Sequence, residues 1–232
     1  MTGRLLPSGE RAVLVEVDTL DEVLRLHRQL WLGQRAPGLL DAVVGARTLL
    51  LVATSAADLA GVRAEASRLL ALGSDPSPAS APPALDDPSR GDGAVVEIEV
   101  HYDGPDLADV AHLTGLSPEQ VVAAHTGRVW RVGFSGFAPG FAYLVDGDPA
   151  LRVPRRSTSR TRVPGGSVGL ADDFSGIYPR SSPGGWQLIG RTEQVLWDLD
   201  RDPPALLRPG LRVQQRTAPG VDVDSIHAAG GG

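Results

Sequence analysis

The hydrophobic pattern at the start of the chain predicts a small layered unit of strands and helices. Apolar and polar positions alternate in two short segments, as in strands with one buried face, and each is followed by apolar residues at helical spacing. Thr19 and Glu22 have the spacing of a capping box, and Ser55 with Asp58 is placed to cap the second helix. We expect strands at 12–18 and 48–53 and helices at 19–31 and 55–70, which together form an N-terminal ferredoxin-like α/β domain.

The second half of the chain has the pattern of a β-rich domain. Residues 73–93 contain five prolines and almost nothing suited to a core, so they predict a linker or an exposed loop. A strand at 95–101 and a helix opened by Ser117 follow, and then short apolar strands separated by Gly/Pro turns. Because a closed or nearly closed barrel protects the edges of such strands, we expect an α+β protein with domains at 1–92 and 93–232. The residues expected to share strand faces are Trp130, Val132 and Phe134; Val195, Trp197 and Leu199; and Leu211 with Val213.

The composition excludes several classes of chemistry. The chain has no cysteine, which excludes disulfides and thiol nucleophiles. All 22 basic residues are arginine, so neither Schiff-base chemistry nor a lysine-bearing phosphate loop is possible within the chain. The net charge of −6 argues against general binding to nucleic acid. No apolar run approaches the roughly 20 residues that span a bilayer, and the N-terminus lacks a secretion signal. We therefore expect a cytoplasmic protein.

Three segments rich in glycine, proline and aromatic residues stand out at 133–144, 154–169 and 176–191. Interleaved glycines let backbone amides approach a ligand closely, while the aromatic rings supply walls. The second segment and Arg152 together place five arginines within eleven residues, which favours a site for a carboxylate or phosphate. A solvated loop or an interface patch is the alternative interpretation. We expect the three segments to converge at one mouth of the barrel, with a second protein closing the pocket.

A serine motif and the histidines are two further candidates for catalytic residues. Gly165 to Gly169 match the G-x-S-x-G pattern of a serine nucleophile, but Pro164 precedes the motif and Gly176 follows too soon for the helix that such an elbow needs. The five histidines show no metal-ligand spacing, so no metal site is expected. His125 is different, because it ends a helix just before the first glycine-rich segment. From there it would reach the same cleft as a base or a hydrogen-bond donor, or would serve a structural role at the helix end.

The order and spacing of several short motifs resemble a known family. The family includes the B subunit of 5-oxoprolinase, allophanate hydrolase subunit 1, the kinase inhibitor KipI and part of the carboxyltransferase domain of urea carboxylase. The motifs that carry the resemblance are His125, GFAPGFAYL at 136–144, PRR at 154–156, RTRVP at 160–164, GSVG at 166–169, GIYP at 176–179 and SPGGWQLIGR at 182–191. They span roughly 65 residues, and a weaker likeness extends from about Arg11 to Val213.

The resemblance implies a fold and a divided active site. It implies an N-terminal α/β domain, a C-terminal cyclophilin-like β-barrel, and a partner subunit with a related barrel. Carried over to this sequence, it favours His125 and Arg162 as catalytic residues. Arg162 and the backbone amides of the loops would stabilise negative charge on an activated amide oxygen. The residues expected to bind substrate are Gly136, Pro139, Gly140, Phe141, Tyr143, Pro164, Gly166, Ser167, Tyr178, Gly184, Gly185, Trp186 and Gln187.

The resemblance also implies an activity that depends on other chains. The first hypothesis is that the chain is part of an ATP-dependent 5-oxoprolinase, which hydrolyses 5-oxo-L-proline to L-glutamate. Its partners would be the KipA-like C subunit of that enzyme and a third protein, the A subunit, and a partner would bind most of the ATP. A second hypothesis is a carboxyltransferase subunit of the allophanate hydrolase or urea carboxylase type. Only then would biotin be a cofactor, arriving on another protein because this chain has no lysine. A third is a KipI-like inhibitor of a histidine kinase.

Overall fold

The computed structural model describes residues 3–32, 36–72 and 95–219, and it divides the chain into two compact units. The units are Met1–Asp87 and Pro88–Gly232. The predicted linker at 73–93 and the predicted boundary at residue 92 lie outside the described residues. Within those residues, the longest apolar helices fall short of what a membrane crossing requires.

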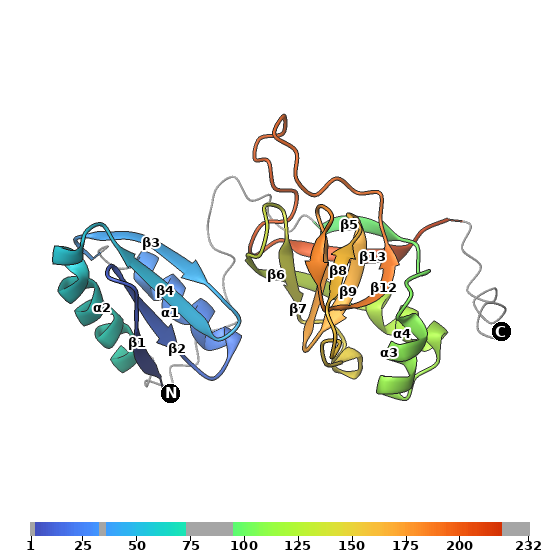
Figure 1. Ribbon diagram of the computed structural model, residues 1–232, viewed down its shortest axis with the longest axis horizontal. Helices are drawn as coiled ribbons and strands as arrows, with labels where there is room; N and C mark the ends of the chain where they lie inside the picture. Colours follow the sequence, from blue (N-terminus) through green and yellow to red (C-terminus); the bar gives the residue numbers. More distant parts are fainter. Residues whose placement is uncertain (1–2, 33–35, 73–94, 220–232) are drawn as a thin grey trace. The chain divides into compact units, whose positions relative to one another are not determined.

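The first unit is an antiparallel sheet with the order β1-β2-β4-β3 (Figure 1). Helices α1 and α2 contact each other and strand β4, so they form a second layer on one face of the sheet. Val15 and Leu49 pair across β2 and β4, and both are buried against the helices. The elements are β1 (Arg4–Ser8), β2 (Ala12–Glu16), α1 (Leu20–Leu32), β3 (Leu39–Val44), β4 (Thr48–Ala53), a 3₁₀ turn (Ala56–Asp58) and α2 (Leu59–Leu72).

Two details of the first unit differ from the hydrophobic pattern. The pattern predicts two strands, but β1 and β3 complete the sheet at its two edges. Edge strands bury little, since Leu6 and Val43 remain 37% and 45% exposed, so their alternation is weak. The N-terminal strand β1 occupies the edge that the last strand takes in the usual ferredoxin-like order. The predicted capping box is confirmed, because the amide of Glu22 donates to Thr19 Oγ1 at 3.3 Å and the amide of Thr19 donates to Glu22 Oε2 at 3.1 Å.

The second unit is a curled seven-stranded sheet with the order β12-β9-β10-β7-β6-β13-β5. The backbones of His101 and Arg191 exchange two hydrogen bonds of 2.8 and 2.9 Å, which join the two edges of the sheet. The predicted barrel is therefore confirmed. The elements are β5 (Val95–Val100), α3 (Leu107–Thr114), α4 (Pro118–Thr126), β6 (Val129–Ser135), β7 (Ala142–Val145), β8 (Arg160–Val163), β9 (Ser167–Ala171), β10 (Phe174–Ile177), β11 (Ser182–Gly184), β12 (Gln187–Arg191) and β13 (Arg212–Thr217), with a 3₁₀ turn at Pro149–Leu151.

The last strand of this unit lies between two earlier ones. Strand β13 pairs in parallel with β5 along its whole length and antiparallel with β6. Inward-facing residues of all seven strands form one core, to which α3 and α4 add Val110 and Val121. Trp130 and Val132 belong to this core as the strand pattern predicts. The prediction is wrong for Phe134, because the register shifts after Val132 and the Phe134 ring stacks on Tyr143 outside this core. The ribbon of β8 and β11 is a separate two-stranded layer.

One predicted strand face is wrong. Val195, Trp197 and Leu199 do not lie on a strand of the sheet, and they are 55%, 39% and 79% exposed. The backbone is extended at Trp197, which forms an isolated bridge with Ala205, but Leu199 lies in a turn. The pattern finds the extended conformation but cannot tell an inward face from an outward one.

Candidate functional site

The three glycine-rich segments meet on the outer face of the barrel sheet rather than at its mouth. Ala142 and Leu144 point into the barrel core, so Tyr143 between them lies on the opposite face of β7. The β8–β11 ribbon pairs Val163 with Ser182 and so brings the second and third segments together. The expected convergence is confirmed, but its expected position is wrong.

Backbone hydrogen bonds lock these segments to one another. Gly166 donates to the carbonyl of Tyr178 at 2.7 Å, and Arg156 donates to the carbonyl of Gly185 at 2.8 Å. Gly166 has a φ of +81° and a Cβ there would lie 2.4 Å from the carbonyl oxygen of Thr192, so the position accepts glycine only. The loops form one rigid surface.

Aromatic rings fill the space between the sheet and the ribbon. Phe141, Tyr178 and Trp186 are almost wholly buried, and the Phe141 ring lies 5.5 Å from each of the other two in edge-to-face geometry. They act as the floor of the surface. Tyr143 is half-buried above Trp186, with ring centroids 5.6 Å apart, and Phe137 is 61% exposed. Of the five rings named here, Tyr143 and Phe137 are the ones that offer contact area to a ligand.

A single buried carboxylate anchors the arginine-rich segment. Asp106 is 1% exposed and lies directly before α3. Arg156 donates to it at 2.6 Å, and Arg160 donates twice, at 2.7 and 2.9 Å. The amide of Leu188 donates to the same carboxylate at 2.7 Å. Asp106 thus ties the second segment to strand β12 and neutralises one of the two guanidinium charges.

The anchor leaves other arginines available to a ligand. Arg155, Arg162 and Arg180 are exposed, and no ion pair with a carboxylate is found for them among the described residues. Arg162 donates from Nε to Ser181 Oγ at 3.2 Å. Burial raises the pKa of Tyr143, and the charge of Arg155 opposes that shift, so this guanidinium lies within electrostatic reach of the phenol. The surface combines uncompensated positive charge with a neutral hydroxyl.

His125 lies in the barrel interior, away from this surface. It is 0% exposed, with Tyr102 Oη 2.7 Å from Nδ1 and Ser175 Oγ 2.9 Å from Nε2. Gln215 Nε2 lies 3.2 Å from the same Nε2. Burial lowers the pKa of His125 to about 3, so the ring is neutral at physiological pH. In this structure His125 does not reach the cleft expected from the sequence, because both ring nitrogens are occupied inside the core.

The remaining predicted residues divide into two groups. Gln187 is buried on β12 and donates to the carbonyl of Pro154 at 3.2 Å, while Ser167 is 6% exposed and no helix follows it. These residues hold the loops. The predicted positions at the loop surface, which are exposed or partly exposed, are Gly136, Pro139, Tyr143, Arg162, Pro164, Gly166, Gly184 and Gly185; those in the interior are His125, Gly140, Phe141, Ser167, Tyr178, Trp186 and Gln187.

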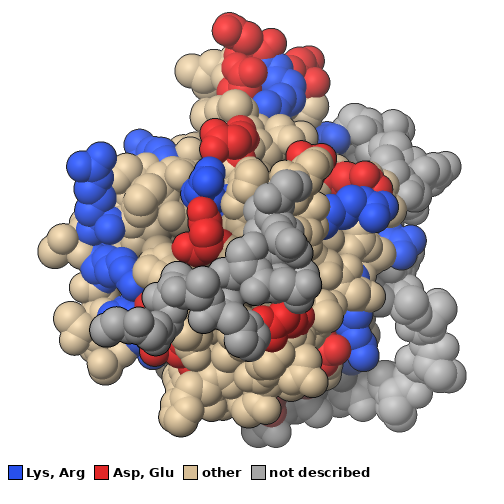
Figure 2. Space-filling model, turned by 90° about the vertical axis from the view of Figure 1, so that its right-hand side faces the viewer, with Lys and Arg blue, Asp and Glu red and all other residues tan. Residues whose placement is uncertain are grey.

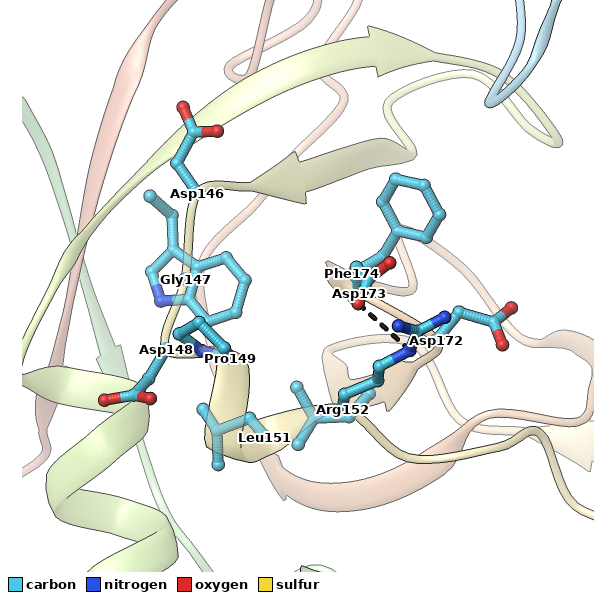
Figure 3. Close-up of a pocket in the computed structure, with 11 residues that line it drawn as sticks. Asp146, Gly147, Asp148, Pro149, Leu151, Arg152, Asp172, Asp173 and Phe174 are labelled. Atoms are coloured by element: carbon cyan, nitrogen blue, oxygen red, sulfur yellow. Dashed lines mark ion pairs between the residues drawn. The ribbon is translucent and has the colours of Figure 1, made fainter. Parts of the chain in front are cut away.

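A separate cavity of about 210 Å³ lies between the segment that follows β7 and the turn that joins β9 to β10 (Figure 3). Trp130 and Leu170 form its apolar base, and Arg152 pairs with Asp173 at its rim at 3.3 Å. Four aspartates line the cavity and Arg152 is its one lining cation, so an anionic guest is disfavoured there. Among the described residues no group of three acidic or histidine side chains could hold a metal ion. The lining aspartates are Asp146, Asp148, Asp172 and Asp173.

Sequence reasoning missed Asp106. An aspartate directly before an apolar helix predicts an N-cap, which satisfies the helix amides. In the structure Asp106 makes no side-chain cap hydrogen bond, and its oxygens face Arg156, Arg160 and Leu188 instead. The five clustered arginines are the one available signal, because such a cluster needs a counter-charge if part of it is to be buried.

Comparison with known proteins places the chain in a family. A family model described as carboxyltransferase domain, subdomain C and D, matches residues 3–207. The B subunit of 5-oxoprolinase from Escherichia coli O157:H7 is 38% identical over 209 residues, covering 87% of this chain and 90% of that protein. The corresponding protein from Bacillus subtilis (strain 168) is 47% identical over 119 residues, which is 50% of each chain. A urea amidolyase from Saccharomyces cerevisiae is 33% identical over 92 residues, or 5% of its length.

Solved structures support the same fold. The crystal structure of TTHA0988 matches with a TM-score of 0.67 and 38% identity, covering 90% of this chain. The match spans only 41% of that longer chain. A conserved uncharacterized protein from Pyrococcus horikoshii, PH0987, matches with a TM-score of 0.53 and 28% identity, covering 93% of this chain and 97% of that one. The urea carboxylase of Kluyveromyces lactis matches at 0.67 with 18% identity, which shows a shared fold.

Proposed function

The chain belongs to the family of carboxyltransferase domains, subdomains C and D, that includes the B subunit of 5-oxoprolinase, and we propose that it is the B subunit of an ATP-dependent 5-oxoprolinase. This assembly hydrolyses 5-oxo-L-proline to L-glutamate, and the chain acts only with partner subunits. Similarity to the Escherichia coli protein over 87% of this chain is the main support for the proposal. The charge and shape of the loop surface supply the physical argument.

The main structural observation behind this proposal is that Arg155, which has no ion pair among the described residues, lies near the half-buried Tyr143. The proposed substrate has one carboxylate and one ring amide, so it needs a cation and a hydrogen-bond donor close together. Arg155 and Arg162 would bind the carboxylate, each as a charge-assisted donor. Phe137 would cover the small apolar ring. The acidic cavity lined by Asp146 and Asp172 offers the wrong sign of charge for this guest.

Ring opening places negative charge on the amide oxygen, and the tyrosine suits that task. Burial raises the pKa of Tyr143, so the phenol keeps its proton and can donate a hydrogen bond to the developing oxyanion. Water adds to the ring carbonyl carbon, the C–N bond breaks, and the nitrogen takes up a proton to become the amine of glutamate. The hydrogen bond from Gly166 to Tyr178 joins the second and third segments and would help to position Arg162.

ATP binding is assigned mainly to the partners. When bound in the assembly, ATP supplies the driving force for opening an unactivated amide. This chain has no lysine and thus no lysine-bearing phosphate loop, although its free arginines fit part of a phosphate group. We infer that the KipA-like C subunit and the A subunit complete the enzyme, in the cytoplasm where ATP is available.

Carboxyl transfer to urea or a similar amide is the second candidate. The description of the matching family model and the partial similarity to yeast urea amidolyase favour it. A biotin group would then arrive on another protein, since this chain offers no lysine to carry it. The higher identity and coverage of the Escherichia coli 5-oxoprolinase protein place hydrolysis first.

Reconstitution tests the proposal. We expect no oxoproline-dependent ATP hydrolysis from the chain alone, and equal release of glutamate and ADP once the A and C subunits are added. Arg162→Ala should lower kcat/KM by about 30-fold, equivalent to the loss of one charged hydrogen bond of about 2 kcal/mol. Arg63→Ala, an exposed arginine of the first unit, is the matched control and should leave the rate unchanged. Equal rates for the two variants, or turnover that requires biotin, would refute this assignment.

A further inference from the structure

The chain between β12 and β13 forms a projecting arm, defined here as residues 195–206. Leu206 donates to the carbonyl of Leu196 at 2.9 Å, and Asp198 donates to that of Pro204 at 3.1 Å. The two halves of the arm therefore run antiparallel and are hydrogen-bonded like a hairpin. Figure 1 shows this segment rising clear of the barrel strands.

The arm is held in place from within. Leu196 is 2% exposed and belongs to the barrel core, as does Leu207 directly after the arm. Arg201 turns back along the arm and donates from Nη2 to the carbonyl of Val195 at 3.0 Å. An ordered arm loses little conformational entropy on binding, so it is preorganised for contact.

The outer side of the arm is apolar. Val195 and Trp197 alternate along extended backbone, and Leu199 opens the turn at the tip of the arm; they are 55%, 39% and 79% exposed. Phe137, in the first glycine-rich loop, is 61% exposed. Contiguous exposed apolar residues that are rigidly presented mark interaction sites rather than chance exposure. Tryptophan is also one of the residues enriched at binding hot spots.

The arm is continuous with the candidate site. A Cβ on Gly140 would lie 2.8 Å from Trp197 Cβ, 3.3 Å from the carbonyl of Leu196 and 3.3 Å from Pro179 Cβ. Gly140 follows Phe137 in the first glycine-rich loop, and Pro179 belongs to the third. A protein that covers the arm would therefore also cover one border of the arginine-bearing surface.

The acidic residues at the tip of the arm indicate which charge the partner's surface should carry. Asp198 lies 4.0 Å from Arg201, and no ion pair of Asp200 or Asp202 is found among the described residues. Figure 2 shows acidic side chains gathered on the topmost projection of the molecule, which this arm forms. The complementary surface is an apolar pocket with a basic rim.

We propose that the arm is the docking element by which this chain binds its partner subunit, and that the partner so placed closes the candidate site. The inference rests on the proposed function, because it assumes that the other proteins of a 5-oxoprolinase are the partners. Two observations favour such a partner over a second copy of this chain. The arm borders the site itself, and the related TTHA0988 chain is more than twice as long as the part that this chain matches.

Binding of the variants to the partners tests the docking element. The full chain is titrated with the purified C subunit, and with the A and C subunits together, by calorimetry and sedimentation. Leu199→Asp changes a side chain that is 79% exposed, so the fold should be retained, and circular dichroism and the melting temperature verify this. We expect the affinity for the C subunit to fall at least tenfold, because the substitution places an unpaired charge in an apolar contact. Leu113→Asp, an apolar residue of α3 that is 49% exposed, is the matched control and should bind like the wild type.

Activity distinguishes this proposal from the proposed function. When the C subunit is saturating, the Leu199→Asp enzyme should recover the wild-type rate, because the residue touches no substrate. Unchanged affinity of Leu199→Asp, or equal losses for Leu199→Asp and Leu113→Asp, would overturn the docking proposal. A wild-type chain that binds neither partner, or that uses the arm only to form dimers, would overturn it too. If the arm governs assembly but the complex releases no glutamate, the docking proposal stands and the proposed function fails.

Discussion

The buried histidine makes the stability of the second unit depend on pH. Burial holds the folded-state pKa of His125 at about 3, against an ordinary value of 6.5. Since the folded pKa is the lower one, the unfolded chain binds a proton first, and stability is lost as pH falls below 6.5 toward 3. Linkage between these two values gives a loss of about 2.5 kcal/mol between pH 7 and pH 4.5. The loss should slow near pH 3, where the folded protein also takes up the proton.

The measurement compares two proteins at two pH values. Urea unfolding, followed by tryptophan fluorescence, gives the free energy of unfolding of the wild type and of His125→Gln at pH 7 and pH 4.5. Carboxylates titrate in both proteins, so the difference between the two pH effects isolates His125. We expect the wild type to lose about 2.5 kcal/mol more than His125→Gln over this range. A difference near zero would mean that the imidazole is accessible to water, as a base in an open cleft would be, and would refute its place in the core.

Two further predictions concern packing and charge in the second unit. Asp106→Asn should lower the free energy of unfolding by about 2–3 kcal/mol, since it removes the buried carboxylate that pairs with two partly exposed guanidinium groups. Asp173→Asn, at an exposed ion pair, should cost less than about 1 kcal/mol. Urea unfolding measures both, and equal effects would contradict the anchoring role of Asp106. Gly147→Ala should cost about 1–3 kcal/mol of folding stability, because its Cβ would lie 2.0 Å from the Trp130 ring. Gly61→Ala, at a position in helix α2 with space for a Cβ, should stabilise the protein by about 0.5–1 kcal/mol. The melting temperatures of the two variants should shift in opposite directions.

Local signals in the sequence predict much of the fold. The capping pair Thr19 and Glu22 depends on residues three apart, and the strand with Trp130 and Val132 on one face depends on alternation, so both can be predicted without tertiary information. Edge strands such as β3 escape detection because one of their sides is solvated and their alternation is weak. The arm was predicted wrongly for the opposite reason. Val195 and Leu199 alternate as in a buried strand, and only the tertiary structure shows that they face outward.

The candidate site was harder to predict because its geometry joins distant parts of the chain. The glycine-rich segments identify the right loops, but their location on the outer face depends on the inward direction of Ala142 and Leu144. The role of Asp106 depends on contacts with residues 50 and 54 positions away. His125 ends its helix as predicted, and whether its ring turns inward or outward is set by Tyr102 and Ser175. The motifs predict which loops form the candidate site, while burial determines which side chains are accessible to a ligand.

The insertion of β13 between β5 and β6 has a consequence for biosynthesis. A nascent chain in which β5 to β12 have left the ribosome still lacks the strand that separates its first and second partners. Vectorial folding of this unit must therefore stall with unpaired strand borders until residues 212–217 emerge as well. During that delay the unfinished barrel is a natural client for chaperones, and premature stop codons before β13 should yield degraded protein rather than a shortened but stable one.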